Sequence, residues 1–89
     1  MQFYEVEITP EGLRHLRELP EKVASAALEL IFGSLAQNPA RAGKALRGEL
    51  EGLWSARRGD YRVIYEFDDE TRVLLIHRVS HRGDVYRKR

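Results

Sequence analysis

Apolar and polar side chains alternate along residues 53–67, LWSARRGDYRVIYEF, on both sides of a Gly59-Asp60 dipeptide. Alternation with a period of two is typical of strands with one buried and one exposed face, and Gly-Asp between two such runs favours a tight turn. The pattern therefore predicts a β-hairpin in which Arg57 lies opposite Arg62. In this register one face of the hairpin is apolar and carries Trp54, Ala56, Val63, Tyr65 and Phe67. The other face is polar and carries Ser55, Arg57 and Arg62.

The polar face of this hairpin brings two guanidinium groups side by side. Like charges repel at such a distance, and folding alone gives no reason to place them there, whereas a bound anion does. The alternative is an ordinary solvated face on which Arg57 and Arg62 pair with Glu51 or Glu66. The polar face of the hairpin is thus either an anion-binding surface or an ordinary solvated surface, and the residues outside the hairpin are needed to choose between these two interpretations.

The residues at the start of the chain predict a strand and a short helix. Residues 3–9 alternate between apolar and acidic side chains, which favours a strand with one buried face. Thr9-Pro10 then provides a helix start, because threonine caps free amides and proline tolerates the first helical turn. The predicted helix spans residues 10–19, with His15 on its outer side and three leucines facing inward, namely Leu13, Leu16 and Leu19.

Residues 21–37 predict a second, longer helix. Pro20 separates it from the first, and Asn38-Pro39 ends it. Its apolar residues follow helical spacing at Val23, Ala27, Leu30, Ile31 and Leu35. Two antiparallel helices are expected to pack on the apolar face of the sheet.

Residues 39–52 read as a long irregular loop. A loop of this length in so small a domain is usually functional, although a plain connector is the alternative. It carries three flexible cations, Arg41, Lys44 and Arg47.

The segment after the hairpin predicts an acidic turn and a last strand over residues 72–79. If Asp69 and Glu70 form the turn, the register sets His77 opposite Arg62. The predicted order is therefore β-α-α-β-β-β, a small α+β domain with an antiparallel sheet core and an N-terminal helical hairpin packed on one face.

Composition narrows the class of protein further. A chain of 89 residues suits one domain, spanning residues 1–89. With 43% hydrophobic and 33% charged residues it is expected to fold. The absence of cysteine excludes disulfides and thiolate chemistry. No apolar run reaches the roughly 20 residues that span a bilayer, so no membrane partner and a cytoplasmic location are expected.

Charge is unevenly distributed along the chain. The net charge is only +1, but residues 1–40 carry −3 and the remainder +4. Such asymmetry favours an anionic partner, for example nucleic acid, for the second half. The three histidines lack metal-ligand spacing, so neither a metal nor another cofactor is expected.

The available side chains suit phosphate chemistry. No Gly-rich phosphate loop, zinc signature or G-x-S-x-G motif occurs, whereas Arg, Lys, His and Tyr are concentrated in the second half. Metal-independent RNA cleavage needs a base for the 2′-hydroxyl, cations for the phosphorane and an acid for the 5′-oxygen. Arginine suits the second task, since it binds phosphate bidentately and stays charged. His81, Tyr86 and Lys44 are the candidates for the proton transfers.

Four segments together carry a family resemblance that covers essentially the whole chain. They are K-x-L-R-G at residues 44–48, LWSARRGDYRVIY at residues 53–65, D-D-E-x-x-V at residues 68–73 and HRGDVYR at residues 81–87. The sequence resembles the RelE/ParE toxin superfamily of toxin–antitoxin systems, and within it the RelE branch. This resemblance implies the RelE-like microbial RNase fold. It also implies a ribosome-dependent mRNA interferase that cleaves A-site mRNA by metal-independent 2′-hydroxyl attack, inhibits translation and is neutralised by a cognate antitoxin.

The resemblance also assigns roles by position. Arg62 matches the arginine that stabilises the phosphorane, Arg82 the arginine assigned to the leaving group, and Tyr86 the tyrosine that stacks on or orients the substrate. Arg57 falls at the position of a catalytic lysine, and Arg47 at that of a loop arginine. The predicted catalytic set is therefore Arg57, Arg62, His81, Arg82 and Tyr86, and the predicted RNA contacts are Arg41, Lys44, Arg47, Arg58 and Arg87.

Ser55 departs from the family pattern, because it stands where the branch has a second strand lysine that is a candidate general base. His81 is one candidate to take over the role of this lysine. Alternatively, the role is not filled, and the protein is a slower nuclease or cuts poorly and acts by occupying a site. Two further functions stay open at this point. One is a ParE-like toxin that poisons DNA gyrase without chemistry of its own, and the other is a degenerate toxin whose remaining role is a DNA-binding complex with its antitoxin. The antitoxin is expected over the cationic face or against the helical hairpin.

Overall fold

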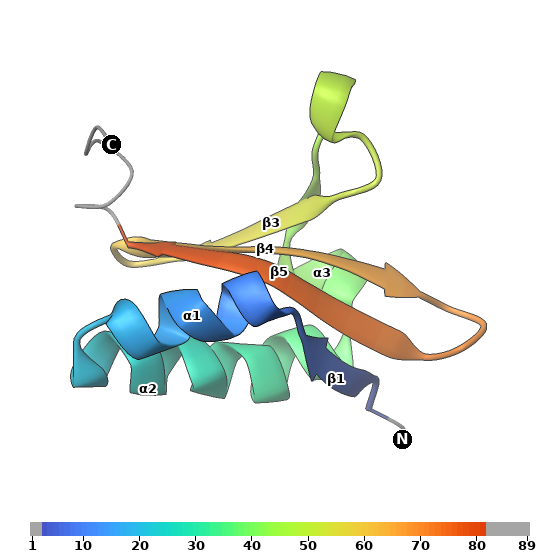
Figure 1. The fold of residues 1–89 in the computed structure, drawn as a ribbon. Coiled ribbons are helices and arrows are strands. Elements are labelled where there is room, and N and C mark those ends of the chain that lie inside the picture. The colour runs from blue at the N-terminus through green and yellow to red at the C-terminus, as the bar shows by residue number, and fades with distance from the viewer. Residues whose placement is uncertain (1–2, 82–89) are drawn as a thin grey trace.

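A five-stranded sheet separates two helices on one side from a protruding loop on the other (Figure 1). The computed structural model describes residues 3–81. The elements in chain order are β1 (Glu5–Ile8), α1 (Pro10–Glu18), α2 (Glu21–Leu30), the π-helical η1 (Ile31–Leu35), α3 (Pro39–Ala42), β2 (Lys44–Ala45), the 3-10 turn η2 (Gly48–Leu50), β3 (Trp54–Arg58), β4 (Tyr61–Asp68) and β5 (Val73–His81). The predicted α+β class is confirmed, with three short elements, α3, β2 and η2, added to the predicted order.

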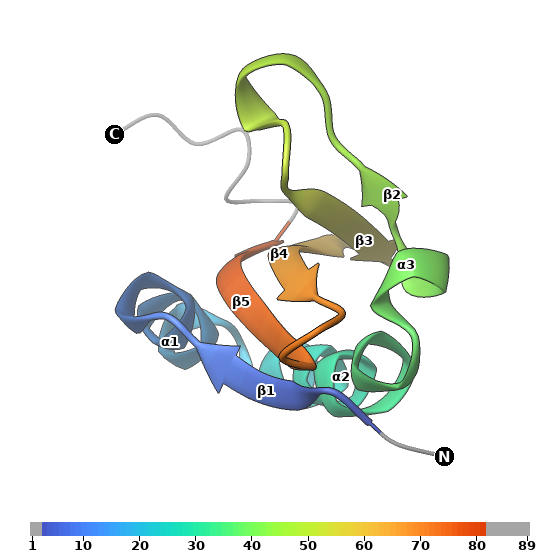
Figure 2. The same cartoon turned by 90° about the vertical axis from the view of Figure 1, so that its right-hand side faces the viewer.

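The sheet has the strand order β1-β5-β4-β3-β2. Strand β1 pairs with β5 in parallel, and the other neighbours are antiparallel. Figure 2 shows α1 beside the β1–β5 edge and α3 near β2 at the opposite edge. The hydrophobic core fills the space between the sheet and the helices, with Val63, Tyr65, Leu74, Ile76, Leu35 and Ile31 among its fully buried members.

The β3–β4 hairpin has the predicted register. Arg57 lies opposite Arg62, and Ser55 lies opposite Ile64. Gly59 adopts φ 59°, a left-handed conformation that glycine tolerates without strain. The two-residue turn and the period of two were therefore sufficient to place these side chains.

The predicted position of His77 opposite Arg62 is wrong; Ser80 lies opposite Arg62. The β4–β5 turn contains four residues, Asp69 to Arg72, instead of two, and a register shift at Ile64/Tyr65 displaces the ladder again. The Asp68 carboxylate holds the turn by accepting from the amides of Glu70 at 2.8 Å and Thr71 at 3.3 Å.

Tyr4 contacts Arg72, the last residue of this turn, whose backbone is left-handed. Its hydroxyl donates to Asp69, and the Arg72 guanidinium lies 3.9 Å from the centre of its ring. Arg72 has φ 61°, the one positive value of a non-glycine among residues 3–81. These side-chain contacts help to hold a conformation that arginine rarely adopts.

Helix α1 begins as predicted, but two of its side chains lie differently. Thr9 caps it, its Oγ1 accepting from the Gly12 amide at 3.0 Å. Leu13 is 43% exposed, so its predicted inward position is wrong: the buried stripe turns toward Gly12, Leu16 and Leu19 because α1 packs along the edge of β5. The predicted outward position of His15 is also wrong; its Nδ1 accepts from the Val79 amide at 3.2 Å.

The predicted long helix over residues 21–37 is confirmed as one continuous helical run through α2 and η1. Its buried side chains, Ala27, Leu30, Ile31 and Leu35, belong to the predicted apolar face. The Ala26 carbonyl accepts from the hydroxyl of Tyr61 at 2.9 Å and so ties α2 to β4.

The segment after this helix is more ordered than predicted. Asn38 caps α3 by accepting from the Arg41 amide at 3.3 Å. The Tyr65 hydroxyl donates to the carbonyl of Pro39 at 2.7 Å, and Lys44 pairs with Ser55 across β2 and β3. Residues 39–45 are thereby attached to the sheet, so the irregular loop is shorter than the sequence suggested.

Candidate nucleic-acid interface

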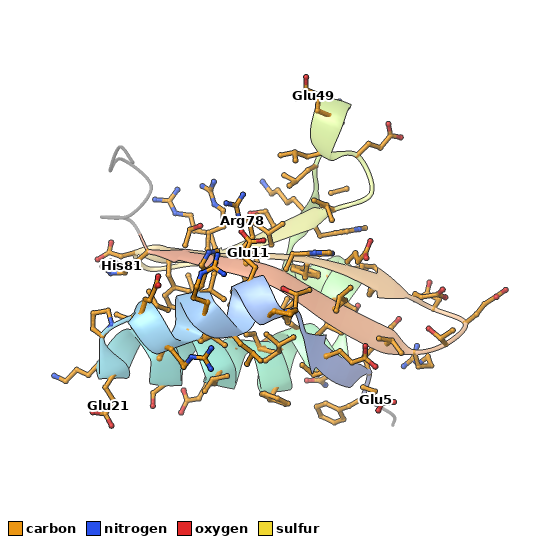
Figure 3. All side chains as sticks on the ribbon, viewed as in Figure 1. Glu5, Glu11, Glu21, Glu49, Arg78 and His81 are labelled. Carbon is orange, nitrogen blue, oxygen red and sulfur yellow. The ribbon has the colours of Figure 1, made fainter. Side chains whose placement is uncertain are left out.

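The face of the sheet opposite the helices carries two rows of side chains that run across the strands. The register places Arg57, Arg62 and Ser80 in one row, which we call the arginine row. Two residues further along the strands lies a second row, the lysine row, formed by Lys44, Ser55, Ile64 and Arg78. Because side chains two residues apart share a face, both rows point away from the helices. Figure 3 shows Arg78 on this side of the sheet.

The two central guanidinium groups are not neutralised by neighbouring carboxylates. Within residues 3–81, neither Arg57 nor Arg62 forms an ion pair. Glu66, the partner expected for a plain solvated face, instead has its Oε2 3.2 Å from Nε2 of His77. Both arginine side chains are exposed. The positive charge of the arginine row is therefore available to an external anion.

Acidic side chains occupy the other end of the same face. Glu66 and Glu7 both align with Leu75, and Asp68 lies two residues beyond Glu66 on β4. The open face is thus electrically divided, with cations toward the β3–β4 turn and carboxylates toward β1. A polyanion is attracted to the first half and repelled by the second.

Three of the predicted site residues are brought together on the cationic half, namely Arg57, Arg62 and Lys44. The loop that contains η2 rises above this side of the sheet, as the labelled Glu49 shows (Figure 3). Arg47 is exposed at the start of η2, and Arg41 is exposed in α3.

Two other predicted residues lie apart from Arg57 and Arg62. Arg58 and His81 are both opposite Tyr61, whose side chain is buried toward α2, so strand alternation turns them to the helix side. His77, in contrast, reaches Glu66 on the open face. Arg82, Tyr86 and Arg87 lie outside the described residues.

Sequence reasoning missed Arg78 and the role of Tyr65. The register shift places Arg78 opposite Ile64, and nothing in the pattern of residues 72–79 indicates that shift. Burial raises the pKa of Tyr65 to about 12. Its phenol donates to the carbonyl of Pro39, and this bond positions the segment leading to Lys44.

The described part of the chain was compared with two further features, a metal site and a membrane-spanning helix. No three metal-ligating side chains of His, Cys, Asp or Glu gather anywhere in residues 3–81. Among the same residues, no helix has the length and apolar character to cross a membrane.

Known proteins resemble this chain in sequence and in fold. The sequence profile of the family described as "ParE toxin of type II toxin-antitoxin system, parDE" matches residues 6–86. "Toxin RelE" of Mycobacterium tuberculosis is 54% identical over 85 residues, covering 94% of this chain and 87% of that protein. "Toxin RelG" of the same organism is 47% identical over 85 residues, covering 96% and 98%.

A solved structure agrees with the sequence relatives. The toxin–antitoxin complex RelBE2 from Mycobacterium tuberculosis contains a chain that superposes with a TM-score of 0.89 at 46% identity. The match covers 94% of this chain and 97% of that chain. The likeness in fold therefore extends over nearly the whole chain.

Proposed function

The chain belongs to the RelE/ParE superfamily of type II toxin–antitoxin toxins, and we propose that it acts as a ribosome-dependent endoribonuclease on A-site mRNA. The observation that carries this proposal is the Arg57–Arg62 cross-strand pair, exposed on an open face and without an ion pair within residues 3–81. The names of the relatives, RelE and RelG, support the RelE branch.

The proposed reaction is transesterification of the RNA backbone. The 2′-oxygen attacks the adjacent phosphorus, the bond to the 5′-oxygen breaks, and a 2′,3′-cyclic phosphate and a 5′-hydroxyl result. One proton leaves the 2′-hydroxyl and one is delivered to the 5′-oxygen. Arg57 and Arg62 stabilise the charge that accumulates on the phosphorane, because guanidinium groups bind phosphate oxygens bidentately and need no reorganisation during the reaction.

The proton transfers are assigned to side chains within residues 81–86 of the sequence. The proposed groups are His81, Arg82 and Tyr86. His81 ends β5 opposite Tyr61 and so faces the helix side, whereas His77 shares the face of Arg62. Parallel measurements on His81→Ala and His77→Ala separate the two imidazoles. Loss of a general acid or base should lower the single-turnover rate by roughly 10²- to 10⁴-fold, and an unchanged rate removes that histidine from the mechanism.

A cognate antitoxin is the proposed protein partner. The related RelBE2 structure is a toxin–antitoxin complex, which supports such a partner here. Two surfaces suit it: the cationic half of the open face, and the outer side of α2 and η1. On the latter, Leu28 and Phe32 are 37% and 55% exposed and lie one helical turn apart.

Primer extension on translated mRNA after expression of the protein tests the nuclease proposal. Codon-positioned cuts should appear with the wild type, disappear with Arg62→Ala and persist with Arg17→Ala, which removes an arginine from α1 on the other side of the sheet. Poisoning of DNA gyrase is the competing function, and the ParE description of the matching family favours testing it in the same cells. Intact mRNA together with gyrase-linked DNA breaks would refute the nuclease proposal.

A further inference from the structure

Arg78 is a cation of the open face to which neither the sequence pattern nor the family resemblance assigned a role. It ends the lysine row on β5, and Lys44 begins that row on β2. Its side chain is 54% exposed, and its Nη2 lies 3.8 Å from Oε2 of Glu11 at the start of α1. Figure 3 shows Arg78 and Glu11 next to each other. So exposed and long an ion pair contributes little stability, which leaves the guanidinium free to exchange its partner.

The distribution of charge on this face fixes the direction in which a polyanion can lie. Along the strands, a phosphate chain leaving the arginine row would meet the carboxylates of Glu66, Glu7 and Asp68. Across the strands, it would pass a row with a cation at each end, Lys44 on β2 and Arg78 on β5, and with the uncharged Ser55 and Ile64 between them. The attractive path therefore runs perpendicular to the strands.

The width of this path matches a short stretch of single-stranded RNA. Lys44 and Arg78 are separated by three inter-strand spacings, about 14 Å at ~4.8 Å each. A stacked strand rises about 3.4 Å per nucleotide, so the path accommodates about four nucleotides. Arg57 and Arg62 lie on the two middle strands, two residues to one side of this line, which leaves room for a phosphate at each end of it.

We propose that Arg78 binds a phosphate of the mRNA that neighbours the scissile one, and that the RNA crosses the sheet from β2 to β5 between Lys44 and Arg78. Glu11 is the carboxylate that the phosphate replaces. Arg78 is thus a substrate-positioning residue, and this inference rests on the proposed nuclease function. Since it contacts the RNA away from the reacting atoms, its loss should weaken binding and leave the chemical step unchanged.

Single-turnover cleavage on programmed ribosomes tests the role of Arg78. Arg78→Gln should raise the half-saturating toxin concentration roughly three- to tenfold and leave the maximal rate unchanged. It should also reduce the slope of log affinity against log salt concentration by about 0.7, the value for one phosphate contact on a single strand. Arg17→Gln, the matched control on α1, should change neither quantity.

Glu11→Gln provides the complementary test. Removing the competing carboxylate should lower the half-saturating concentration, and this effect should disappear in the Arg78→Gln background. An equal effect in both backgrounds would show that Glu11 acts only through net charge. Glu11 Oε2 also lies 3.7 Å from Nε2 of His15, so unfolding midpoints are compared to establish that each variant keeps the fold.

Binding of a short single-stranded RNA, without ribosomes, distinguishes failure of this inference from failure of the proposed function. If the wild type does not cleave but Arg78→Gln weakens oligonucleotide binding and lowers its salt slope, the nuclease proposal fails and the RNA path stands. If Arg62→Ala abolishes cleavage but Arg78→Gln changes neither affinity nor slope, the nuclease stands and the path is wrong. An equal loss of affinity for ribosomes without mRNA would assign Arg78 to ribosomal RNA and also overturn the path.

Discussion

Replacing Gly43 by alanine should destabilise the fold through the attachment of β2. The backbone of Gly43 is extended, at φ −138° and ψ −162°, so conformation is no obstacle to a side chain. Space is the obstacle: a Cβ would lie 2.6 Å from the carbonyl oxygen of Ser55 and would overlap the hydroxyl of Tyr65. The hydroxyl is held by its bond to Pro39, and the carbonyl belongs to β3, so neither can withdraw freely.

The expected cost is about 2–3 kcal/mol, the upper part of the range for overpacked sites. A domain of this size has about 4–13 kcal/mol of stability in total. With a urea m-value of about 1–1.5 kcal/mol/M, the unfolding midpoint should fall by about 2 M. Because Lys44 follows directly, the half-saturating concentration for RNA should also rise.

Urea unfolding at pH 7, followed by circular dichroism, measures this cost. Gly33→Ala is the control, since no atom outside its own helix backbone and its chain neighbours lies within 4 Å of the position of its Cβ, and alanine there should be neutral or stabilising. Tyr65→Phe should partly rescue Gly43→Ala, because it removes one of the two obstructing atoms. A midpoint for Gly43→Ala within 0.3 M of the wild type, about 0.4 kcal/mol, would refute the packing argument.

Three further predictions concern hydrogen bonds of the framework. Burial raises the pKa of Tyr65 from 10.0 to about 12. The stability that depends on its protonated phenol is therefore complete below pH 10, and roughly 3 kcal/mol is lost as the pH rises from 10 through 12. Urea unfolding between pH 9 and 12 should show a larger loss in the wild type than in Tyr65→Phe, in which the raised pKa values of Tyr4 and Tyr61 remain, and parallel pH dependences would contradict it. Thr9→Ala should lower the free energy of unfolding by about 1–2 kcal/mol in thermal melts, since it removes the cap of α1 and a 3.1 Å hydrogen bond to the His77 carbonyl. Thr9→Ser should retain most of both interactions. An equal loss of stability in the two variants would exclude the hydroxyl as the cause. His15→Ala should leave the Val79 amide without its acceptor and accelerate its hydrogen exchange, and unchanged protection would mean that the imidazole bond is not formed in solution.

The β3–β4 hairpin could be predicted residue by residue because its information is local. The period of two assigns each side chain to a face, and the glycine of the turn fixes the register. Arg57 and Arg62 could therefore be paired from the sequence alone. The long helix was predictable for a similar reason, since its apolar stripe extends over several turns.

The β4–β5 register could not be predicted, because it depends on contacts between distant residues. Arg72 adopts a left-handed conformation while its guanidinium lies on the Tyr4 ring, a contact that no local pattern encodes. The register shift at Ile64/Tyr65 adds a second displacement. Together they replace His77 by Ser80 opposite Arg62 and bring Arg78 into the lysine row.

Short elements were missed for a different physical reason. Strand β2 contains two residues, too few to show a period, and its place in the sheet depends on Tyr65 and Gly43. The inward-facing stripe of α1 was misjudged at Leu13 because the helix covers the edge of β5 and not the centre of the sheet.

The parallel pairing of β1 with β5 has a consequence for the timing of biosynthesis. The pairing joins Glu5 to Val73, so the N-terminal strand finds its neighbour only after nearly 70 further residues have been translated. Contacts so distant in sequence form late, and a chain still lacking β5 has neither the strand that joins β1 to β4 nor Arg78. The nascent chain therefore completes its sheet, and the row that ends in Arg78, only once β5 has emerged from the exit tunnel.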